Sequence, residues 1–379
     1  MTSSRARLSH PSRTPLPGRL TNGQLFAVMF LAVFPTMAML LPGDLIRLGG
    51  RYGWWTPLLA AVPAVGAVWL LGAAGGRGGD SVSAAMRGLG RVAGRALLLI
   101  EWLALGAYMV VIIREAGEIA NVTLVTANIP VWILTGLTML PAALLVWWGP
   151  VVLGRAAMLI WPILVFMYMI VLAAILPSSH VIWALPLIPR NARFAAWQSV
   201  VRTWVWEAEP GFLGAALMGH VQAEARRSAG RTLALAVVAS AILTALGTWC
   251  MVAEVGPRGV AAGALPVLDL VNRITFGQTV QHLQSVVLPI ETAGTVLKVG
   301  IFLWVWSHLG QRIVGGAGHV VLVVEGVGGA VLAVALFPNV LAVDRSLYFW
   351  LARWALPVLC GGTAVAYGTA AVARSRRRA

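Results

Sequence analysis

The sequence predicts an all-α polytopic membrane protein with ten transmembrane helices. Of the 379 residues, 59% are hydrophobic and only 11% are charged, a balance that soluble globular domains do not reach. Apolar windows of about 20 residues, the length needed to cross a bilayer, recur along the whole chain. They lie near residues 24–46, 54–73, 95–118, 129–148, 152–176, 197–219, 231–254, 283–308, 318–338 and 346–372.

The basic residues indicate topology. The formal charge is +15, but the arginines lie between apolar runs and form no face interleaved with aromatic residues, so we expect a lipid bilayer and no nucleic acid as partner. Most arginines fall in the tails and the even-numbered connections: Arg5, Arg7, Arg13, Arg19, Arg77, Arg87, Arg91, Arg95, Arg155, Arg226, Arg227, Arg231, Arg312, Arg374, Arg376, Arg377 and Arg378. The positive-inside rule therefore predicts that both termini are cytoplasmic.

The same pattern sets the expected domains. The first residues are polar and basic and lack the apolar core of a signal peptide, which predicts a cytoplasmic tail over residues 1–20. A single transmembrane domain follows over 21–372, and a second basic tail over 373–379.

Spans one and six are both predicted to be interrupted at mid-depth. Pro35 removes a backbone donor in the middle of span one, and Pro210 with Gly211 lies inside span six. These spans hold corresponding positions in two five-span halves, and matched interruptions point to the site of an inverted-repeat transporter. The expected architecture is a 5+5 inverted repeat with broken helices 1 and 6. Two chance kinks are the alternative.

The connection after span two predicts surface structure. Its glycines, in Gly75-Gly76-Arg77-Gly78-Gly79-Asp80, are expected to form a flexible loop, and residues 81–91 then favour a short amphipathic helix on the cytoplasmic surface. At the other end of span three, Arg114 and Glu118 are four residues apart on one helical face, which favours an ion pair.

Span six carries two carboxylates, Glu207 and Glu209, next to its Pro-Gly interruption. A charge near the bilayer centre costs roughly 2.5 kcal/mol or more, and broken backbone at that depth survives only where protein or a water-filled cavity satisfies it. This combination is typical of substrate sites in helical transporters. A kink with one carboxylate near the interface and the other ion-paired is the alternative.

Span eight carries Glu291 and Lys298, seven residues apart and therefore on one helical face. Lys298 is the only lysine of the chain, and a lysine, unlike an arginine, can lose its proton when it is desolvated. We expect Lys298 either to contact the substrate or take part in proton transfer, or to form a structural ion pair with Glu207, Glu209 or Glu291.

Catalytic and metal chemistry are not expected. The chain has no nucleophile elbow, zinc motif or Walker loop, and the two cysteines, Cys250 and Cys360, lie in apolar spans where they predict packing and no disulfide. We therefore expect a protein that is not an enzyme and that uses no cofactor.

Several segments, taken in order, are similar to one family. They are Leu20-Thr21-Asn22-Gly23-Gln24-Leu25-Phe26, Leu41-Pro42-Gly43, Gly53-Trp54, Ile112-Ile113-Arg114-Glu115-Ala116-Gly117-Glu118-Ile119, Ile129-Pro130, Leu185-Pro186-Leu187-Ile188-Pro189, Glu209 and Leu297-Lys298-Val299. With them the chain resembles the spore-germination receptor B subunits, permease-like members of the amino acid/polyamine/organocation superfamily. It departs from the family at Pro35-Thr36-Met37, where glycines are usual, and at Ala208, where a glycine is expected.

The resemblance implies a leucine-transporter-like fold with spans one and six unwound around a small-molecule site. It also implies a subunit that senses germinants, commonly amino acids, in the spore inner membrane or cell membrane, together with an A-type membrane subunit and a C-type lipoprotein. The expected ligand-binding residues are Phe34, Pro35, Thr36, Met37, Trp206, Glu207, Glu209, Gly211, Glu291 and Lys298.

Three functions follow as hypotheses. The first is a sensor of a small amino-acid-like ligand, in which free amides at the interrupted helices take the ligand's carboxylate and Glu209 or Glu207 takes its ammonium group. The second is a proton-coupled amino-acid transporter that uses Glu209, Glu291 and Lys298. The third is a structural scaffold in which these groups are merely paired.

Overall fold

The computed structural model describes residues 18–123, 129–185, 194–263, 266–271, 284–315, 318–337 and 348–376. Within these ranges the regular structure is helical, and one isolated β-bridge joins Leu20 to Val221. The α-helices are α1 (Asn22–Gly49), α2 (Thr56–Gly78), α3 (Ser81–Thr123), α4 (Val131–Trp147), α5 (Pro150–Ile175), α6 (Phe194–Glu207), α7 (Glu209–Leu217), α8 (Ala223–Ala262), α9 (Pro266–Val271), α10 (Gln284–Val314), α11 (Gly318–Leu336) and α13 (Tyr348–Arg376). The short 3-10 helices are η1 (Gly50–Trp55), η2 (Leu176–Ser178), η3 (Val181–Ala184) and η4 (Met218–His220).

The helices agree with the predicted windows. Each window overlaps a helix, and the sixth overlaps the pair α6 and α7. Seven stretches of the described residues are long and apolar enough to cross a membrane, and one of them, Asn22–Gly78, contains both α1 and α2. The helix α4 is apolar but shorter.

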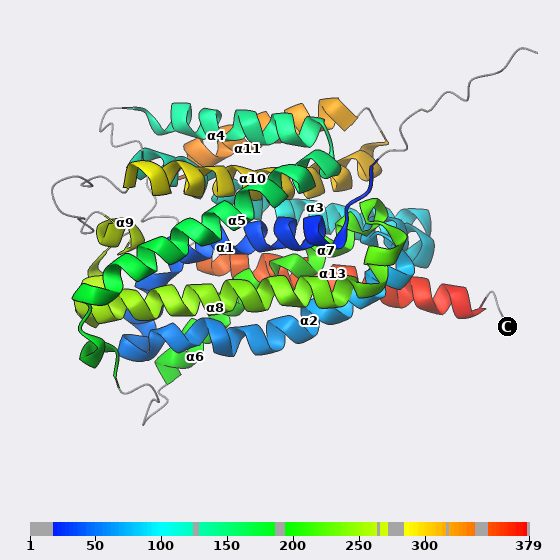
Figure 1. Ribbon diagram of the computed structural model, residues 1–379. Helices are drawn as coiled ribbons and strands as arrows, with labels where there is room; N and C mark the ends of the chain where they lie inside the picture. The colour runs from blue at the N-terminus through cyan, green and yellow to red at the C-terminus, as the bar shows by residue number, and fades with distance from the viewer. Residues whose placement is uncertain are drawn as a thin grey trace, which may run out of the picture.

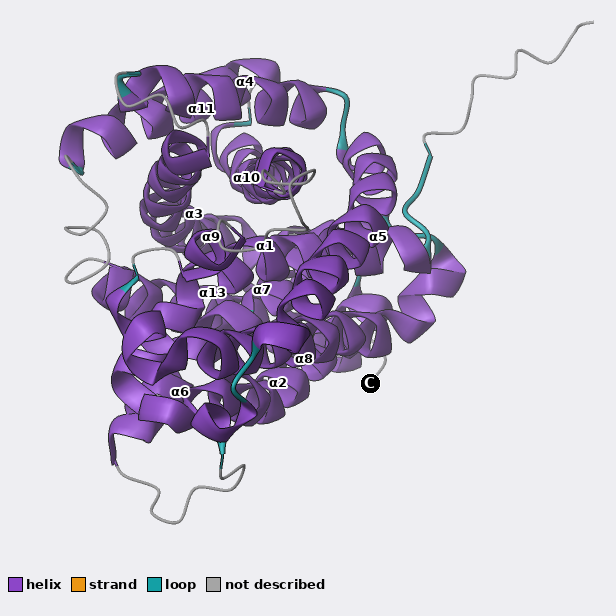
Figure 2. Cartoon of the chain, turned by 60° about the vertical axis from the view of Figure 1, so that its left-hand side comes forward, coloured by secondary structure: helices purple, strands orange, loops and turns teal. Residues whose placement is uncertain are grey.

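Helix α1 lies at the centre of the bundle (Figures 1 and 2). It begins with a capping box, in which the Thr21 Oγ1 accepts from the Gln24 amide at 3.2 Å and the Gln24 Oε1 accepts from the Thr21 amide at 3.0 Å. Its middle is buried on every side, because α5, α6, α7, α8 and α10 all pack against it.

The expected break of the first span is wrong. Helix α1 is continuous through Pro35 and Pro42. A proline in a helix deprives only the carbonyl four residues earlier of its amide donor, here that of Leu31 for Pro35. The neighbouring helices that enclose α1 keep the remaining ladder in place, so Pro35 interrupts a hydrogen bond without ending the helix.

The sixth span, in contrast, is divided. Helix α6 ends at Glu207 and α7 begins at Glu209, with Ala208 between them. Pro210 lies in the first turn of α7, the position in a helix that tolerates a missing amide best. The Gly211 amide bonds the Ala208 carbonyl at 3.0 Å, which tightens the junction.

The helices form layers around α1. Helices α4 and α11 lie on one side of α3 and α10, and α2, α6 and α8 lie on the other (Figures 1 and 2). Helices α2 and α8 approach closely where two glycines meet: a Cβ on Gly72 would lie 2.8 Å from the Cα of Gly230. Small residues of this kind let helix backbones pack tightly in membranes.

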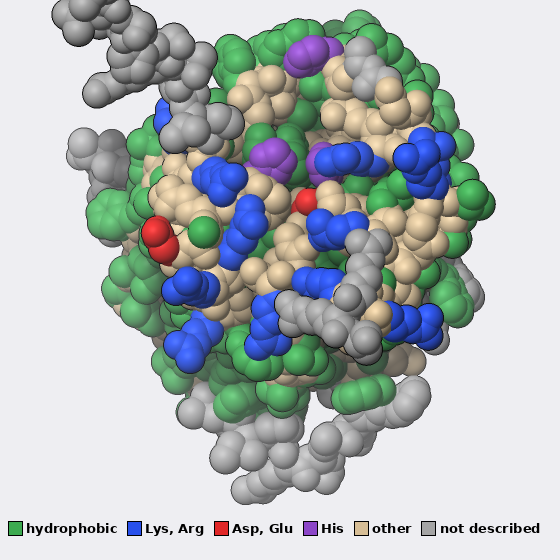
Figure 3. All heavy atoms as spheres, turned by 90° about the vertical axis from the view of Figure 1, so that its right-hand side faces the viewer, with side chains coloured by type: hydrophobic (Ala, Val, Ile, Leu, Met, Phe, Trp, Pro, Cys, Tyr) green, Lys and Arg blue, Asp and Glu red, His purple; other side chains and the backbone are tan. Residues whose placement is uncertain are grey.

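One end of the bundle is strongly basic (Figure 3). Here the Arg374 Nη1 donates to the Arg77 carbonyl at 3.3 Å, and the Arg226 Nη2 donates to the Gly219 carbonyl at 3.0 Å. The start of α1 lies at the same end, because the Leu20 amide bonds the His220 carbonyl at 2.8 Å. We call this the basic end. It groups arginines that the sequence assigns to the cytoplasmic side.

Candidate ligand-binding site

A buried ion pair joins helices α7 and α10. The Nζ of Lys298 lies 3.4 Å from the Oε2 of Glu209, and both side chains are fully buried. The two residues lie far apart in the sequence and on different helices, so this contact forms only when the bundle is assembled. Of the three acidic partners that the sequence leaves open for Lys298, the structure selects Glu209.

Two further polar groups complete the pair. The Lys298 Nζ donates to the Thr36 Oγ1 of α1 at 2.6 Å, and the Tyr108 hydroxyl of α3 donates to the Glu209 Oε1. Hydrogen bonds to charged groups contribute more than neutral ones, typically about 1.5–3 kcal/mol each. The cluster therefore links α1, α3, α7 and α10 through four side chains.

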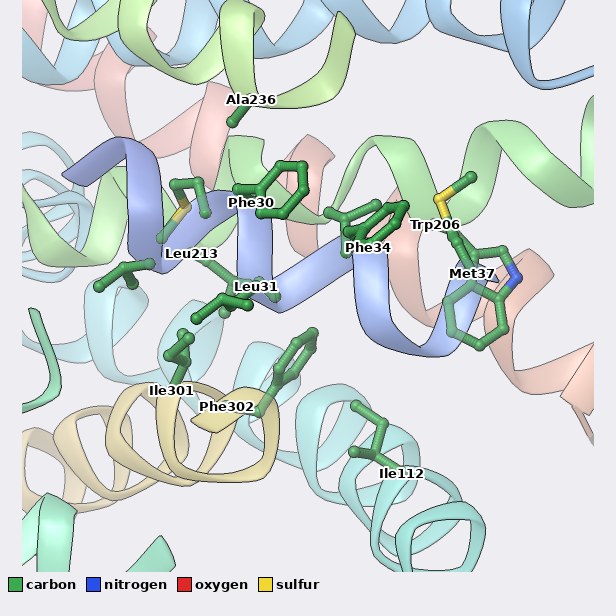
Figure 4. Close-up of a cluster of buried hydrophobic side chains, with 14 of the residues drawn as sticks. Phe30, Leu31, Phe34, Met37, Ile112, Trp206, Leu213, Ala236, Ile301 and Phe302 are labelled. Carbon is green, nitrogen blue, oxygen red and sulfur yellow. The ribbon is translucent and has the colours of Figure 1, made fainter. Parts of the chain in front are cut away.

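Aromatic rings enclose the ammonium group. The Lys298 Nζ lies 4.5 Å from the centroid of the Trp206 ring and 5.5 Å from that of the Phe302 ring. Both are within the range of a cation–π interaction. Figure 4 shows Trp206 and Met37 in the same part of the core as Phe302. The rings exclude water, which strengthens the electrostatic attraction inside the cluster.

The helix junction positions Glu209. As the first residue of α7 it places a carboxylate at a helix N-terminus, where the helix dipole favours negative charge. Gly211 allows this turn to lie close to α2, because a Cβ there would meet Leu71 at 3.0 Å. The Pro-Gly sequence thus sets both the break and the approach of α7 to its neighbour.

The remaining predicted residues contribute in other ways. Phe34 stacks on Phe30, with ring centroids 4.9 Å apart, and meets the edge of Tyr168. Pro35 packs on α10 at Gly294, where a Cβ would lie 3.1 Å from the proline Cγ. Both side chains therefore pack against neighbouring helices.

Glu207 and Glu291 are the two predicted carboxylates that do not join the cluster. Glu207 is fully buried and neither of its oxygens has a hydrogen-bond partner among the described residues. Glu291 is 6% exposed, and its Oε1 likewise lacks one.

Sequence reasoning missed Tyr108 and Phe302. The signal for Tyr108 was a phenolic hydroxyl in the middle of an apolar span, where a polar group needs a partner. Phe302 gave no signal, because one more phenylalanine in an apolar helix is indistinguishable from a packing residue. The predicted pair of Arg114 and Glu118 is confirmed, with nitrogen and oxygen 2.7 Å apart.

Comparison with known families decides the broader identity. The family described as spore germination protein matches residues 19–338. The chain belongs to this family. A comparison with curated proteins finds no match to this chain.

Solved structures similar to this spore germination protein share its fold at low sequence identity. MhsT in complex with L-phenylalanine has a TM-score of 0.69 and 16% identity, covering 91% of this chain and 87% of its own. Mhp1, a nucleobase-cation-symport-1 family transporter with bound bromovinylhydantoin, has a TM-score of 0.60 and 14% identity, with coverages of 93% and 79%. A Na⁺-coupled sialic acid symporter has a TM-score of 0.60 and 11% identity, with coverages of 92% and 79%.

These similarities establish a leucine-transporter-like fold. The chain is an integral multi-pass membrane protein of permease-like type, and similar solved structures include transporters.

Proposed function

We propose that this protein is the ligand-sensing membrane subunit of a germinant receptor and that it binds a small amino-acid-like molecule at the Lys298–Glu209 cluster. The observation that carries the proposal is the buried pair itself, held by Thr36 and Tyr108 and enclosed by Trp206 and Phe302. An ammonium ion between a carboxylate and aromatic rings is the environment that an amino-acid ligand's own ammonium group requires.

The burial of the Lys298–Glu209 cluster supports a mechanism in which a ligand replaces Lys298 as the partner of Glu209. Lys298 and Glu209 are fully buried and Trp206 is 3% exposed, so a ligand enters only when the helices separate. A ligand's ammonium group would then take the place of Lys298 at Glu209, and its carboxylate would pair with the released lysine. Because the ligand would bind only the opened packing, it shifts the population of the two states, and that shift is the signal.

The resemblance to germination receptor B subunits supports a proposal for the wider assembly. We propose ten membrane crossings in a 5+5 inverted repeat with cytoplasmic termini, in the spore inner membrane or cell membrane. An A-type membrane subunit and a C-type lipoprotein would be the partners that read the shift in packing.

A proton-coupled amino-acid transporter is the second candidate. The buried carboxylates of Glu207 and Glu291 favour it, since groups of this kind can carry protons across a membrane. Neither oxygen of Glu207 has a hydrogen-bond partner among the described residues, and the Oε1 of Glu291 lacks one too. The solved relatives, which are transporters, also support it. A scaffold without a ligand, the third hypothesis, would leave the cluster purely structural.

Uptake and binding in proteoliposomes test these alternatives. A panel of radiolabelled amino acids is offered with and without a proton gradient to wild type, to Glu209→Gln, and to Glu224→Gln as the control, because Glu224 is exposed at the start of α8. The sensor predicts saturable binding without gradient-driven accumulation, weakened about tenfold or more by Glu209→Gln through loss of one charged partner.

The other outcomes separate the candidates. Gradient-driven accumulation that Glu209→Gln abolishes and Glu224→Gln preserves would establish the transporter in place of the sensor. Absence of binding across the panel, in protein that is folded and reconstituted with its partner subunits, would favour the scaffold.

A further inference from the structure

A cavity lies at the basic end, and neither Lys298 nor Glu209 lines it. It has a volume of about 750 Å³ and lies between α4, α10, α11 and η4. This volume falls within the range of small-molecule sites. The lining residues are Val146, Trp147, His220, Trp304, Ser307, His308, Gln311, Arg312, Gly315, Gly318, His319 and Leu322.

The lining favours an anion. It contains Arg312 and three histidines but no aspartate or glutamate. Two acidic groups lie nearby and already accept hydrogen bonds. The oxygens of Glu325 accept from Trp102 Nε1 at 2.5 Å and from the lining residue Ser307, through its Oγ, at 2.6 Å, and Asp80 accepts from the Ser83 amide. A guanidinium with several N–H donors is the arrangement that binds phosphate groups best.

The imidazoles are held in place and have spare hydrogen-bonding capacity. The ring of His308 stacks on Trp304 with centroids 5.0 Å apart, and that of His319 stacks on Trp147 at 4.0 Å. The buried Nε2 of His308 has no hydrogen-bond partner among the described residues. Burial lowers the pKa of His220, so this ring is neutral near pH 7 and contributes an N–H donor, while Arg312 supplies the fixed positive charge.

The flanking helices present apolar side chains to the outside. On α4, Leu140 and Leu144 are 62% and 46% exposed, and on α11, Val320 and Val324 are 63% and 65% exposed. In a bilayer these surfaces contact acyl chains. The cavity is thus a basic pocket at the end of two lipid-facing helices, where an anionic headgroup can enter from the membrane.

We propose that this cavity is a binding site for a phosphate group, with Arg312 as the charged contact and the three histidines as hydrogen-bond partners. The lipid-facing walls favour an anionic phospholipid as the source of that phosphate. A soluble phosphorylated molecule presents the same chemistry, and the experiment separates the two sources.

The test compares substitutions of Arg312, which lines the cavity, and Arg155, which is predicted to lie on the same side of the membrane. Wild type, Arg312→Gln and Arg155→Gln are purified as full chains; Arg155 is an exposed arginine at the start of α5 that does not line the cavity. Native mass spectrometry measures how much phosphatidylglycerol and phosphatidylcholine each protein retains. In parallel, thermal unfolding is followed with and without inorganic phosphate. Gln311→Glu, which adds a carboxylate to the lining, is a second variant.

A lipid site predicts that wild type and Arg155→Gln retain phosphatidylglycerol over phosphatidylcholine, and that Arg312→Gln and Gln311→Glu retain about tenfold less of it, the effect of one charged hydrogen bond. Stabilisation by inorganic phosphate that only the cavity variants lose, without any lipid preference, would assign the site to a soluble phosphorylated molecule. If Arg312→Gln and Arg155→Gln behave alike with both probes, the proposal is overturned.

Discussion

Lys298 and Glu209 place opposite charges in contact where no water is available to solvate either one. Transferring such charges from water costs several kcal/mol for each ion, and the attraction between them offsets this only when both are present. Each of the two residues therefore depends on its partner more than a residue of a surface ion pair does. Replacing one partner alone tests whether the pair is buried and charged.

The substitution Lys298→Met removes the cation and leaves Glu209 buried without its counter-charge. We expect the free energy of unfolding to fall by about 3 kcal/mol, the usual cost of breaking a buried pair from one side. Thermal unfolding in detergent measures this. The double variant Lys298→Met with Glu209→Gln should recover much of the loss, and Arg155→Met should change little. A single variant as stable as wild type would contradict a buried charge pair.

The sequence indicated which charges mattered but could not assign the pairing. Glu207 and Glu209 are two positions apart, which in a continuous helix separates their directions by about 200°, so only one of them can face a given neighbour. Which one does depends on the geometry of the turn at Ala208 between α6 and α7, which the sequence pattern does not specify. Tyr108 was missed for the same reason, because its partner comes from a distant helix.

At the scale of the element, the two prolines predicted to interrupt spans behave differently. Pro35 lies in a helix that α5, α6, α7, α8 and α10 enclose, and α1 continues through it. Pro210 is followed at once by Gly211, which adds the conformational cost of glycine to the lost hydrogen bond, and the helix divides. The ten apolar windows could thus be predicted from composition alone. Whether a proline ends the helix in a given window depended on the residues next to it and on the surrounding helices.

The close contact between α2 and α8 leaves no room for an added methyl group at Gly72. In Gly72→Ala the new Cβ would lie 2.8 Å from the Gly230 Cα, a backbone atom that cannot rotate away. We expect the two helices to move apart and the unfolding free energy to fall by about 1–3 kcal/mol, as for other overpacked sites.

Gly66→Ala is the matched control for this change. It lies on the same helix, and a Cβ there meets nothing within 4 Å. Thermal unfolding of both variants measures the difference. Equal stability of the two would mean that the close approach of α2 to α8 is not maintained in the membrane.

For the whole molecule, the distribution of arginine predicts orientation. Arg91 lies next to the kink at Gly90, in the segment that follows α2 at the basic end, whereas Arg51 bonds the Leu185 carbonyl at the opposite end. In a background lacking Cys250 and Cys360, a membrane-impermeant maleimide should label Arg51→Cys in intact cells. Arg91→Cys should be labelled only after permeabilisation. The reverse pattern would invert the proposed topology.

The burial of the only lysine leaves the folded chain with no accessible side-chain amine. Apart from the α-amino group of the first residue, an amine-acylating reagent has nothing to modify until α1, α7 and α10 separate. Lys298 is therefore a built-in chemical reporter: the rate at which it is acylated measures how often the cluster opens, without any engineered label.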